Sequence, residues 1–284
     1  MPFSTPLDAP GLGIDAGATL CKIAHFDGNM LVTRALPSGE IDAIRDYIAA
    51  RPALRLVVTG GGARPLADAL STTGAEISHI GEFEAWLRGA APLAAHEGCT
   101  LPERYLLVSL GTGTSILLAS QAKGQRVGGS ALGGGTLLGL GELLLGTRRF
   151  SEIAQLAARG DRRRVDLLVG DIYPAQGAPL PADLNAASFA KLGSREPADL
   201  GHALMAMIGE NVGLICSSLA TLHGADTILY CGSTVRDENP TLREVLRGIG
   251  AAFGHSARFL QQGAFGAALG AALMPDPRRD APVE

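Results

Sequence analysis

The chain has 284 residues, of which 46% are hydrophobic, so it can bury the core of one large domain or two smaller ones. Its net charge of −4 gives no general attraction for nucleic acids or anionic membranes, and we expect neither as a partner. The six histidines and four cysteines form no C-x-x-C pair and no H-x-x-x-H spacing, which argues against a zinc site.

In chain order, the N-terminal part alternates apolar strands with amphipathic helices. Residues 12–26 are predicted to form two strands, 12–16 and 20–26, around a turn of small residues. Isoleucines at helical spacing after a candidate cap at Ser38 predict a helix over residues 38–50. The other predicted elements here are strands at 30–36, 55–59 and about 75–80, and helices at 64–72 and about 83–95.

A polar stretch, HEGCTLPER at residues 96–104, separates this part from a second one. It predicts two domains, residues 1–98 and 99–284. The second part restarts with strands at 105–110 and 114–120 around a glycine turn. The elements predicted after them are strands at 124–129 and 226–232 and helices at 132–146, 150–160, 165–173, 197–224, 241–252 and 264–274.

Both parts begin with strand, glycine turn, strand and strand, followed by helices. This weak internal repeat predicts a duplicated α/β fold with a cleft between its halves. Three strands before a helix differ from strict β-α-β alternation. The chain also lacks G-x-x-x-x-G-K-[ST], and it lacks G-x-G-x-x-G after a strand. The P-loop and the Rossmann dinucleotide fingerprint are therefore absent.

The two glycine turns, in LGIDAGATLCKIAHF and LVSLGTGTSILLA, have the composition of phosphate-binding loops. Backbone N–H groups gathered in such a turn form a concavity that binds anions, and threonine hydroxyls add donors. Asp15 follows an apolar strand and could hold Mg²⁺ through water, and Lys22 could balance phosphate charge. Two ordinary β-hairpins with glycine at positive φ are the structural alternative.

The cysteines are spread along the chain, and three of them lie in apolar surroundings, which is typical of reduced thiols in the cytosol. The start MPFSTPLDAP lacks the basic and apolar regions of a signal peptide. No uninterrupted apolar run reaches the ~18 residues of a membrane-spanning helix. We expect a cytoplasmic protein without a membrane span.

Several longer motifs follow one another along the chain: GIDAGATLCK, VSLGTGTS, RVGGSALGGGTLLGLGELL, FSEIAQLAARGDRRRVDLLVGDIY, YCGS followed by NPTLREVL, and QQGAFGAALGAAL. With them, residues from about 11 to 274 resemble a type II pantothenate kinase, of the actin-like, Hsp70 and sugar-kinase superfamily of ATPases. The hairpins are generic to the superfamily, whereas R-V-G-G-x-x-L-G-G-G-T followed by A-x-x-G-D and D-I-Y is more specific. The resemblance implies a duplicated actin-like, ribonuclease H-like fold, with two lobes and a nucleotide cleft between them.

The resemblance also implies which residues bind ATP, with Asp15 near the metal. The family usually has a second glycine where this chain has Ala18, a departure that bears on nucleotide affinity rather than on the fold. The implied residues are Asp15, Gly17, Ala18, Thr19, Leu20 and Lys22 in the first hairpin, Gly111, Thr112 and Gly113 in the second, Gly134, Gly135, Thr136, Leu137 and Leu138 in the glycine run, Phe150 beside the adenine, and Ser233 at the adenosine.

For catalysis, the resemblance assigns the general base to Glu82 in GEFEAWLRG, while Glu84, two residues on, would face away. Arg126 in QRVGGS matches an arginine near the substrate and the transferring phosphate. Taken alone, Glu82 reads as an ordinary first-turn carboxylate and Arg126 as an exposed strand-end arginine. The implied reaction is the phosphorylation of pantothenate by ATP with Mg²⁺, the first step of coenzyme A biosynthesis.

Two alternatives stay open at this point. One is a kinase of the same fold that acts on pantetheine or on an amino sugar such as N-acetylglucosamine. The other is an activator or regulator that hydrolyses ATP without a small acceptor. The predicted helix 197–224 has more apolar side chains than one buried face needs. The resemblance implies a homodimer, in which the additional apolar side chains could pack against a second copy of the chain. Burial of this helix within its own domain is the structural alternative.

Overall fold

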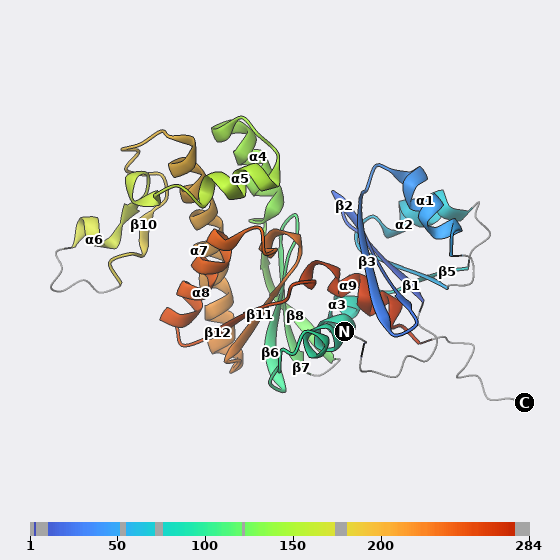
Figure 1. The fold of residues 1–284 in the computed structure, drawn as a ribbon. Coiled ribbons are helices and arrows are strands. Elements are labelled where there is room, and N and C mark those ends of the chain that lie inside the picture. Colours follow the sequence, from blue (N-terminus) through green and yellow to red (C-terminus); the bar gives the residue numbers. More distant parts are fainter. Residues whose placement is uncertain are drawn as a thin grey trace, which may run out of the picture. The chain divides into compact units, whose positions relative to one another are not determined.

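The computed structural model describes Phe3 and residues 11–51, 55–71, 76–120, 123–173 and 181–275 (Figure 1). The chain forms two compact units, each assembled from separate stretches. Unit 1 comprises Met1–Leu107, Leu117–Val127 and Leu260–Glu284, and unit 2 comprises Val108–Ile116 and Gly128–Phe259. The division into domains at residues 98 and 99 stays a prediction.

Unit 1 contains a five-stranded sheet in the order β3-β2-β1-β4-β5. The first three strands of the chain pair in antiparallel fashion, whereas β4 and β5 lie parallel to β1. In the β1–β2 register Asp15 lies opposite Lys22, so the hairpin alone brings a carboxylate and an ammonium group together. The strands are β1 (Leu12–Ala16), β2 (Leu20–Asp27), β3 (Met30–Pro37), β4 (Leu56–Thr59) and β5 (Ile77–His79).

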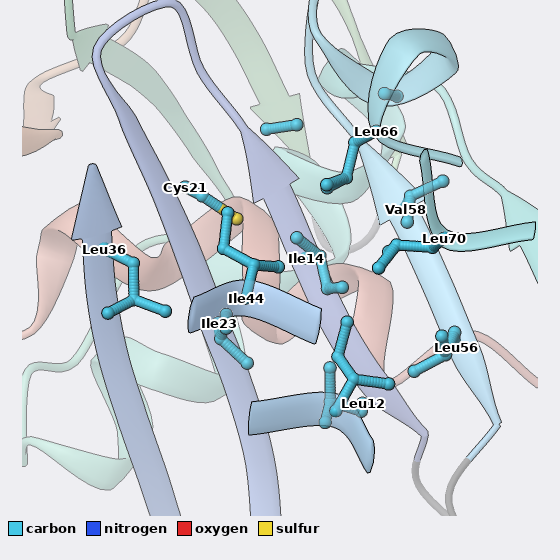
Figure 2. Packing of buried hydrophobic residues seen from close by; sticks show 13 residues of the cluster. Leu12, Ile14, Cys21, Ile23, Leu36, Ile44, Leu56, Val58, Leu66 and Leu70 are labelled. Carbon is cyan, nitrogen blue, oxygen red and sulfur yellow. The ribbon is translucent and has the colours of Figure 1, made fainter. Parts of the chain in front are cut away.

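Helices pack on the sheet of unit 1, and β1 is buried along its whole length. Leu12 and Ile14 point into a cluster formed with side chains of α1 and α2 (Figure 2). Gly13 lies between them and faces α9, because side chains alternate along a strand. A Cβ on Gly13 would lie 2.0 Å from the Ala268 carbonyl oxygen, so only glycine fits there. The helices are α1 (Ile41–Ala49), α2 (Ala63–Leu70), α3 (Glu82–His96) and α9 (Gly266–Ala272), the last preceded by the 3-10 turn η4 (Gly263–Phe265).

Unit 2 contains residues of every strand of a second sheet, in the order β12-β11-β6-β7-β8. Its longest helix, α7, packs against α4, α5 and α8. The strands are β6 (Arg104–Leu110), β7 (Thr114–Ser120), β8 (Lys123–Ser130), β11 (Thr227–Cys231) and β12 (Ser256–Phe259). The helices are α4 (Gly134–Leu145), α5 (Phe150–Ala157), α6 (Val169–Ile172), α7 (Pro197–His223) and α8 (Pro240–Ala252). A separate two-stranded sheet is formed by β9 (Leu167–Leu168) and β10 (Asn185–Ala187). The 3-10 turns are η2 (Arg162–Arg164) and η3 (Ser233–Val235).

The sequence explains where α7 begins and ends. Pro197 stands in its first turn, where the missing N–H costs no hydrogen bond, and Gly224 closes it in the left-handed conformation. Among the described helices, α7 alone is long and apolar enough to cross a membrane, but 67% of its most apolar window is buried inside the structure. That burial is typical of a core helix.

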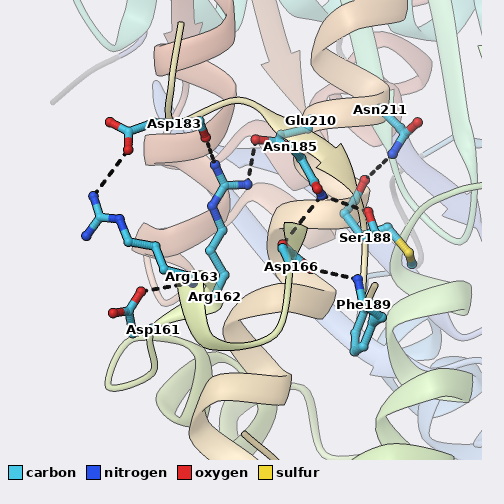
Figure 3. A network of polar contacts seen from close by, with 11 residues as sticks. Asp161, Arg162, Arg163, Asp166, Asp183, Asn185, Ser188, Phe189, Glu210 and Asn211 are labelled. Atoms are coloured by element: carbon cyan, nitrogen blue, oxygen red, sulfur yellow. Dashed lines mark hydrogen bonds and ion pairs between the residues drawn. The ribbon is translucent and has the colours of Figure 1, made fainter. Parts of the chain in front are cut away.

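A buried ion pair ties η2 to α7 in unit 2 (Figure 3). The Arg162 guanidinium donates to Glu210 Oε1 at 2.5 Å and to the Asp183 carbonyl oxygen at 2.6 Å. The side chains of Arg162 and Glu210 are only 15% and 6% exposed. Burial raises the pKa of Glu210, and Arg162 opposes that rise. One arginine therefore joins three chain segments.

A second buried carboxylate, that of Asp166, organises the adjoining segment (Figure 3). The backbone N–H of Phe189 donates to Asp166 Oδ1 at 2.9 Å, and Asn185 Nδ2 lies 3.4 Å from Oδ2. Phe189 has a φ of 60°, a conformation that costs free energy for a residue other than glycine. The hydrogen bond to Asp166 offsets part of that cost.

Replacing Arg162 with Met is expected to lower the free energy of unfolding by about 3 kcal/mol, because it leaves the buried Glu210 carboxylate without a cation. Urea unfolding followed by circular dichroism measures the loss. Arg163→Met is the matched control, since that side chain is 65% exposed and lies 3.5 Å from Asp183, an arrangement that contributes less than about 1 kcal/mol. Equal losses in the two variants would show that the buried pair does not stabilise the fold.

The structure corrects three expectations about local elements. The first helix begins at Ile41 rather than Ser38, and the Ser38 hydroxyl instead donates to the Gly17 carbonyl oxygen at 2.7 Å. Residues 165–173 form a short strand and one helical turn instead of a helix, because Leu167 and Leu168 pair with β10. Strands β10 and β12 were not predicted. The other predicted strands and long helices are confirmed to within a few residues at their ends.

Candidate active site

The first hairpin of unit 1 holds a buried ion pair at the ends of β1 and β2. Lys22 Nζ lies 2.9 Å from Asp15 Oδ2, and the two side chains are 11% and 7% exposed. The turn between them is tight, because the Gly17 N–H donates to the carbonyl oxygens of Asp15 and Leu20. A lysine held in this position at the base of an exposed turn can interact with an anionic group that binds at the turn.

The tip of this hairpin consists of Ala18 and Thr19, and both are exposed. The expected departure from a second glycine is harmless to the backbone here, since Ala18 does not have a positive φ. A hydrogen bond from the residue after β3 holds the turn, since the Ser38 N–H donates to the Thr19 carbonyl oxygen at 3.1 Å. Alanine at this position therefore adds no strain.

Glu82 is the first residue of α3, directly after Gly81 in an extended conformation. Its side chain reaches solvent, yet the protein around it raises the pKa of the carboxyl, first by burial and then by the charge of Asp15. Lys22 acts in the opposite direction. The three groups therefore form one electrostatic cluster in unit 1. Glu84, by contrast, pairs with Arg88 at 3.0 Å on the exposed face of the helix.

A pocket of about 550 Å³ opens beside Glu82. Its wall depends on Gly60, which has a φ of 90° and whose Cβ, if present, would lie 2.7 Å from both Asp15 Oδ1 and the Ala16 carbonyl oxygen. Glycine here lets the loop after β4 approach the Asp15 carboxylate. The lining residues are Gly60, Gly61, Ala63, Arg64, Pro65, His79, Ile80, Gly81 and Glu82.

Sequence reasoning missed most of this pocket. The glycines at 60–62 lie between the predicted strand at 55–59 and the predicted helix at 64–72, and the sequence assigned no role to them. Arg64 and His79 gave no signal, because neither belongs to a motif and each stands alone in its segment. Arg64 comes beside Glu82 only through the packing of α2 within unit 1, whereas His79 stands three residues before Glu82 in the chain.

Arg126 lies on β8 within unit 1 and is exposed. Its guanidinium carbon is 6.0 Å from the ring centroid of Phe83, the residue after Glu82. This cation–π contact holds the arginine near the start of α3. Asp15, Lys22 and Glu82 therefore share one electrostatic cluster in unit 1, although they come from three elements. Arg126 belongs to the same unit and is linked to the start of α3 through Phe83.

The second hairpin, at Gly111–Gly113, is joined to the start of α4 in unit 2. The Gly134 N–H donates to the Gly111 carbonyl oxygen, and the Gly135 N–H donates to that of Thr112, both at 2.8 Å. These two N–H groups are thus engaged within the protein. Glycine at this position lets the start of α4 approach the second hairpin closely, since a Cβ on Gly135 would lie 2.8 Å from Thr112 Cγ2. In the following turn, Leu137 is buried, and Thr136 and Leu138 are partly exposed.

The other two predicted residues of unit 2, Phe150 and Ser233, lie at the starts of α5 and η3. The guanidinium carbon of Arg236, at the end of η3, is 4.8 Å from the Phe150 ring centroid. Thr234 Oγ1 donates to the Gly111 carbonyl oxygen at 3.0 Å, which connects η3 to the second hairpin. The second hairpin, the glycine run and η3 therefore form one hydrogen-bonded assembly. Arg236 lies next to it against Phe150, a position that the sequence did not reveal.

The part of the chain that the structure describes holds no group of three or more histidine, cysteine, aspartate or glutamate side chains placed to share a metal ion. A Mg²⁺ ion that accompanies a nucleotide needs less, because one or two carboxylates suffice when phosphate and water supply the other ligands. Asp15, with one oxygen paired to Lys22, has the right donor chemistry for such an ion.

Comparison with known families identifies close sequence relatives. The family model described as Fumble matches residues 40–274. The type II pantothenate kinase of Oceanobacillus iheyensis is 33% identical over 267 residues, which cover 92% of this chain and 98% of the relative. That of Staphylococcus epidermidis is 33% identical over 265 residues, with the same two coverages.

Comparison with solved structures identifies the fold. The ROK hexokinase of Thermus thermophilus is 15% identical and aligns with a TM-score of 0.56, covering 93% of this chain and 97% of its own. A ROK family glucokinase of Streptomyces griseus, in complex with glucose and AMPPNP, is 14% identical and also has a TM-score of 0.56, covering 93% of this chain and 98% of its own. At such low identity these likenesses show the fold alone. The expected actin-like ATPase fold is confirmed.

Proposed function

The chain belongs to the family of the type II pantothenate kinases, and from this membership we propose that it transfers the γ-phosphoryl group of ATP to the primary hydroxyl of pantothenate. The product is 4'-phosphopantothenate, and the step opens coenzyme A biosynthesis. The observation that carries the proposal is 33% identity to a relative of that name over 92% of this chain and 98% of the relative.

Glu82 is proposed as the general base of this reaction. The acceptor hydroxyl becomes a better nucleophile as a nearby carboxylate takes its proton, and a raised pKa makes that carboxylate a stronger base. Its place at the start of α3, beside a pocket of about 550 Å³, supports this role, because a small acceptor needs both a cavity and a base in reach. Glu84 is engaged by Arg88 and is not a candidate.

Lys22 and Arg126 are proposed to balance the charge that develops on the phosphoryl oxygens, with the N–H groups of the first hairpin. Asp15 would hold Mg²⁺ through water. When bound, Mg²⁺ supplies further neutralisation of phosphate charge. The buried Asp15–Lys22 pair supports this assignment, because it fixes both side chains before any ligand arrives.

The remaining ATP contacts are proposed to come from Gly17, Ala18, Thr19 and Leu20 in unit 1 and from the hydrogen-bonded assembly of unit 2. In unit 2 the aromatic ring of Phe150 would lie beside the adenine, and Ser233 would contact the adenosine. The guanidinium of Arg236 against that ring supports a flat binding surface there. The nucleotide cleft between lobes stays a prediction.

As the pH is lowered, kcat/KM is expected to decrease around a pH above 4.5, the ordinary pKa of glutamate. Burial raises the pKa of Glu82, so the carboxylate becomes protonated and stops acting as a base at a higher pH than an exposed glutamate would. A profile of kcat/KM between about pH 3.5 and about pH 8 measures this acid limb. Circular dichroism at each pH separates it from acid unfolding. An acid limb centred below the ordinary value would contradict the assignment of Glu82 as a base in partly buried surroundings.

A turnover assay with ATP and each of three acceptors, pantothenate, pantetheine and N-acetylglucosamine, tests the proposed function. Release of ADP measures the rate, and mass spectrometry identifies the phosphorylated product. Pantothenate is expected to give the highest kcat/KM. A preference for either other acceptor would select the alternative kinase, and ADP release without an acceptor would select the activator or regulator.

We also propose a homodimer in the cytoplasm. Part of the predicted apolar surplus of α7 is buried within unit 2, but Leu222 and Leu214 on this helix remain 74% and 37% exposed. Light scattering tests the dimer. None of the four cysteines forms a disulfide, and burial raises the pKa of Cys21 and Cys216 to about 12, so these two stay protonated and unreactive. Cysteines without disulfides support a reducing compartment.

A further inference from the structure

We propose that the hydroxyl of Thr59 is a second hydrogen-bond donor for Asp15, and that it bonds to this carboxylate when Lys22 turns to the phosphates of a bound nucleotide. Thr59 is thus a positioning residue, because it acts through Asp15. The inference rests on the proposed function, since it needs a nucleotide at the first hairpin. It does not depend on which acceptor receives the phosphoryl group.

Thr59 is the last residue of β4, and its hydroxyl is buried without a partner. The residue is 0% exposed, and among the described residues no group lies in hydrogen-bonding position to Thr59 Oγ1. A buried hydroxyl without a partner costs free energy, and buried polar groups of folded proteins are hydrogen-bonded as a rule. The hydroxyl therefore points to a partner that it meets in another arrangement of the site.

Thr59 and Asp15 point to the same face of the sheet in unit 1. The parallel register of β1 and β4 pairs the two residues. The residues before them, Ile14 and Val58, both point into the core cluster formed with α1 and α2 (Figure 2). Because side chains alternate along a strand, Asp15 and Thr59 point to the other face, on which α9 packs. The two side chains are therefore neighbours at the ends of adjacent strands.

The Asp15 carboxylate is enclosed between its two neighbouring strands. On the side of β2, Lys22 Nζ lies 2.9 Å from Asp15 Oδ2. On the side of β4, the glycine after Thr59 lies against the other oxygen, since a Cβ on Gly60 would be 2.7 Å from Asp15 Oδ1. The Asp15 side chain is only 7% exposed, so its hydrogen bonds must come mainly from the protein.

A phosphate at the first hairpin competes with Asp15 for the ammonium group of Lys22, because both are anions. A buried carboxylate that loses its cation and finds no other donor costs free energy. The Thr59 hydroxyl stands at the same level of the next strand and can donate a hydrogen bond to that carboxylate. This exchange of partners keeps Asp15 ionised and in place while Lys22 serves the phosphate.

The test compares Thr59→Val with the wild type by urea unfolding without ligand and by calorimetry with the ATP mimic AMPPNP and Mg²⁺. We expect Thr59→Val to raise the urea midpoint, because it removes a buried hydroxyl that has no partner. The same change should raise the dissociation constant for AMPPNP about tenfold, because it removes a hydrogen bond to a charged group. Thr59→Ser should keep the affinity of the wild type, since serine keeps the hydroxyl.

Ser217→Ala is the matched control. Ser217 lies on α7 in unit 2, is 1% exposed, and has an Oγ with no hydrogen-bond partner in the part of the chain that the structure describes. Its replacement should also raise the urea midpoint and should leave the dissociation constant for AMPPNP unchanged. The fall in affinity is thus specific to Thr59, whereas the gain in stability is common to both sites.

A lower urea midpoint in Thr59→Val would show that the hydroxyl already has a partner, such as a buried water, in the ligand-free protein. An unchanged affinity for AMPPNP would show that the hydroxyl gains no partner when the nucleotide binds. Either result overturns the inference and leaves the proposed function standing. A wild type that binds AMPPNP but does not phosphorylate pantothenate contradicts the proposed function instead, and Thr59 is then judged by the same two measurements. A wild type that binds no AMPPNP overturns both proposals.

Discussion

Glu82→Gln lowers kcat for pantothenate phosphorylation by an expected factor of about 10² to 10³, with little change in the KM for ATP. Glutamine keeps the size of the side chain but cannot accept the proton of the attacking hydroxyl. The exposed position of Glu82 at the start of α3 makes loss of folding improbable as the cause. Steady-state kinetics with both substrates varied, with circular dichroism as the check on folding, provides the measurement.

Glu84→Gln is the control for this experiment. Glu84 lies on the same turn of α3, but its side chain is 60% exposed and its carboxylate pairs with Arg88. Its replacement removes a surface ion pair that contributes less than about 1 kcal/mol, so kcat should stay within about twofold. Near-normal turnover in Glu82→Gln would remove the proposed base, and an equal loss in Glu84→Gln would assign the effect to the charge of the helix terminus.

Gly89→Ala is expected to destabilise unit 1 by more than about 4 kcal/mol or to prevent folding. Helices α3 and α9 cross with their backbones in contact, because a Cβ on Gly89 would lie 1.9 Å from the Gly266 carbonyl oxygen and 2.6 Å from the Gly270 nitrogen. Only backbone faces that methyl group, and a backbone atom cannot rotate away as a side chain does. Separating the helices would move α3, which carries Glu82, and α9, which packs on β1.

The single tryptophan of the chain reports on this region. Trp86 is 2% exposed, and a Cβ on Gly266 would lie 2.6 Å from its ring, so its fluorescence follows the packing of α3 on α9 during urea unfolding. Gly248→Ala is the control, because that helical glycine of α8 faces open space. It should raise stability by about 0.5–1 kcal/mol. A normal unfolding midpoint in Gly89→Ala would show that the two helices can separate at little cost.

The sequence by itself determined most local elements, both glycine hairpins and the family. The spacing of apolar residues reflects which side of a strand or helix is buried, and this depends on neighbours a few positions away. The place of Glu82 at a helix start followed from the same local pattern and from the resemblance. The Asp15–Lys22 pair could also be predicted from the sequence, since a short hairpin turn decides which residues lie opposite each other.

Only the tertiary structure decided which residues share a site. Arg64 lies in a pocket with Glu82 because α2 packs beside the start of α3, and no local pattern encodes that packing. Ser38 shows the same limit, since its hydroxyl serves the turn at Gly17 and not the helix that follows it. The glycines at 89 and 270 matter because two distant helices touch through their backbones. Contacts of this kind depend on the shape of the whole packed unit, which the spacing of residues along the chain does not carry.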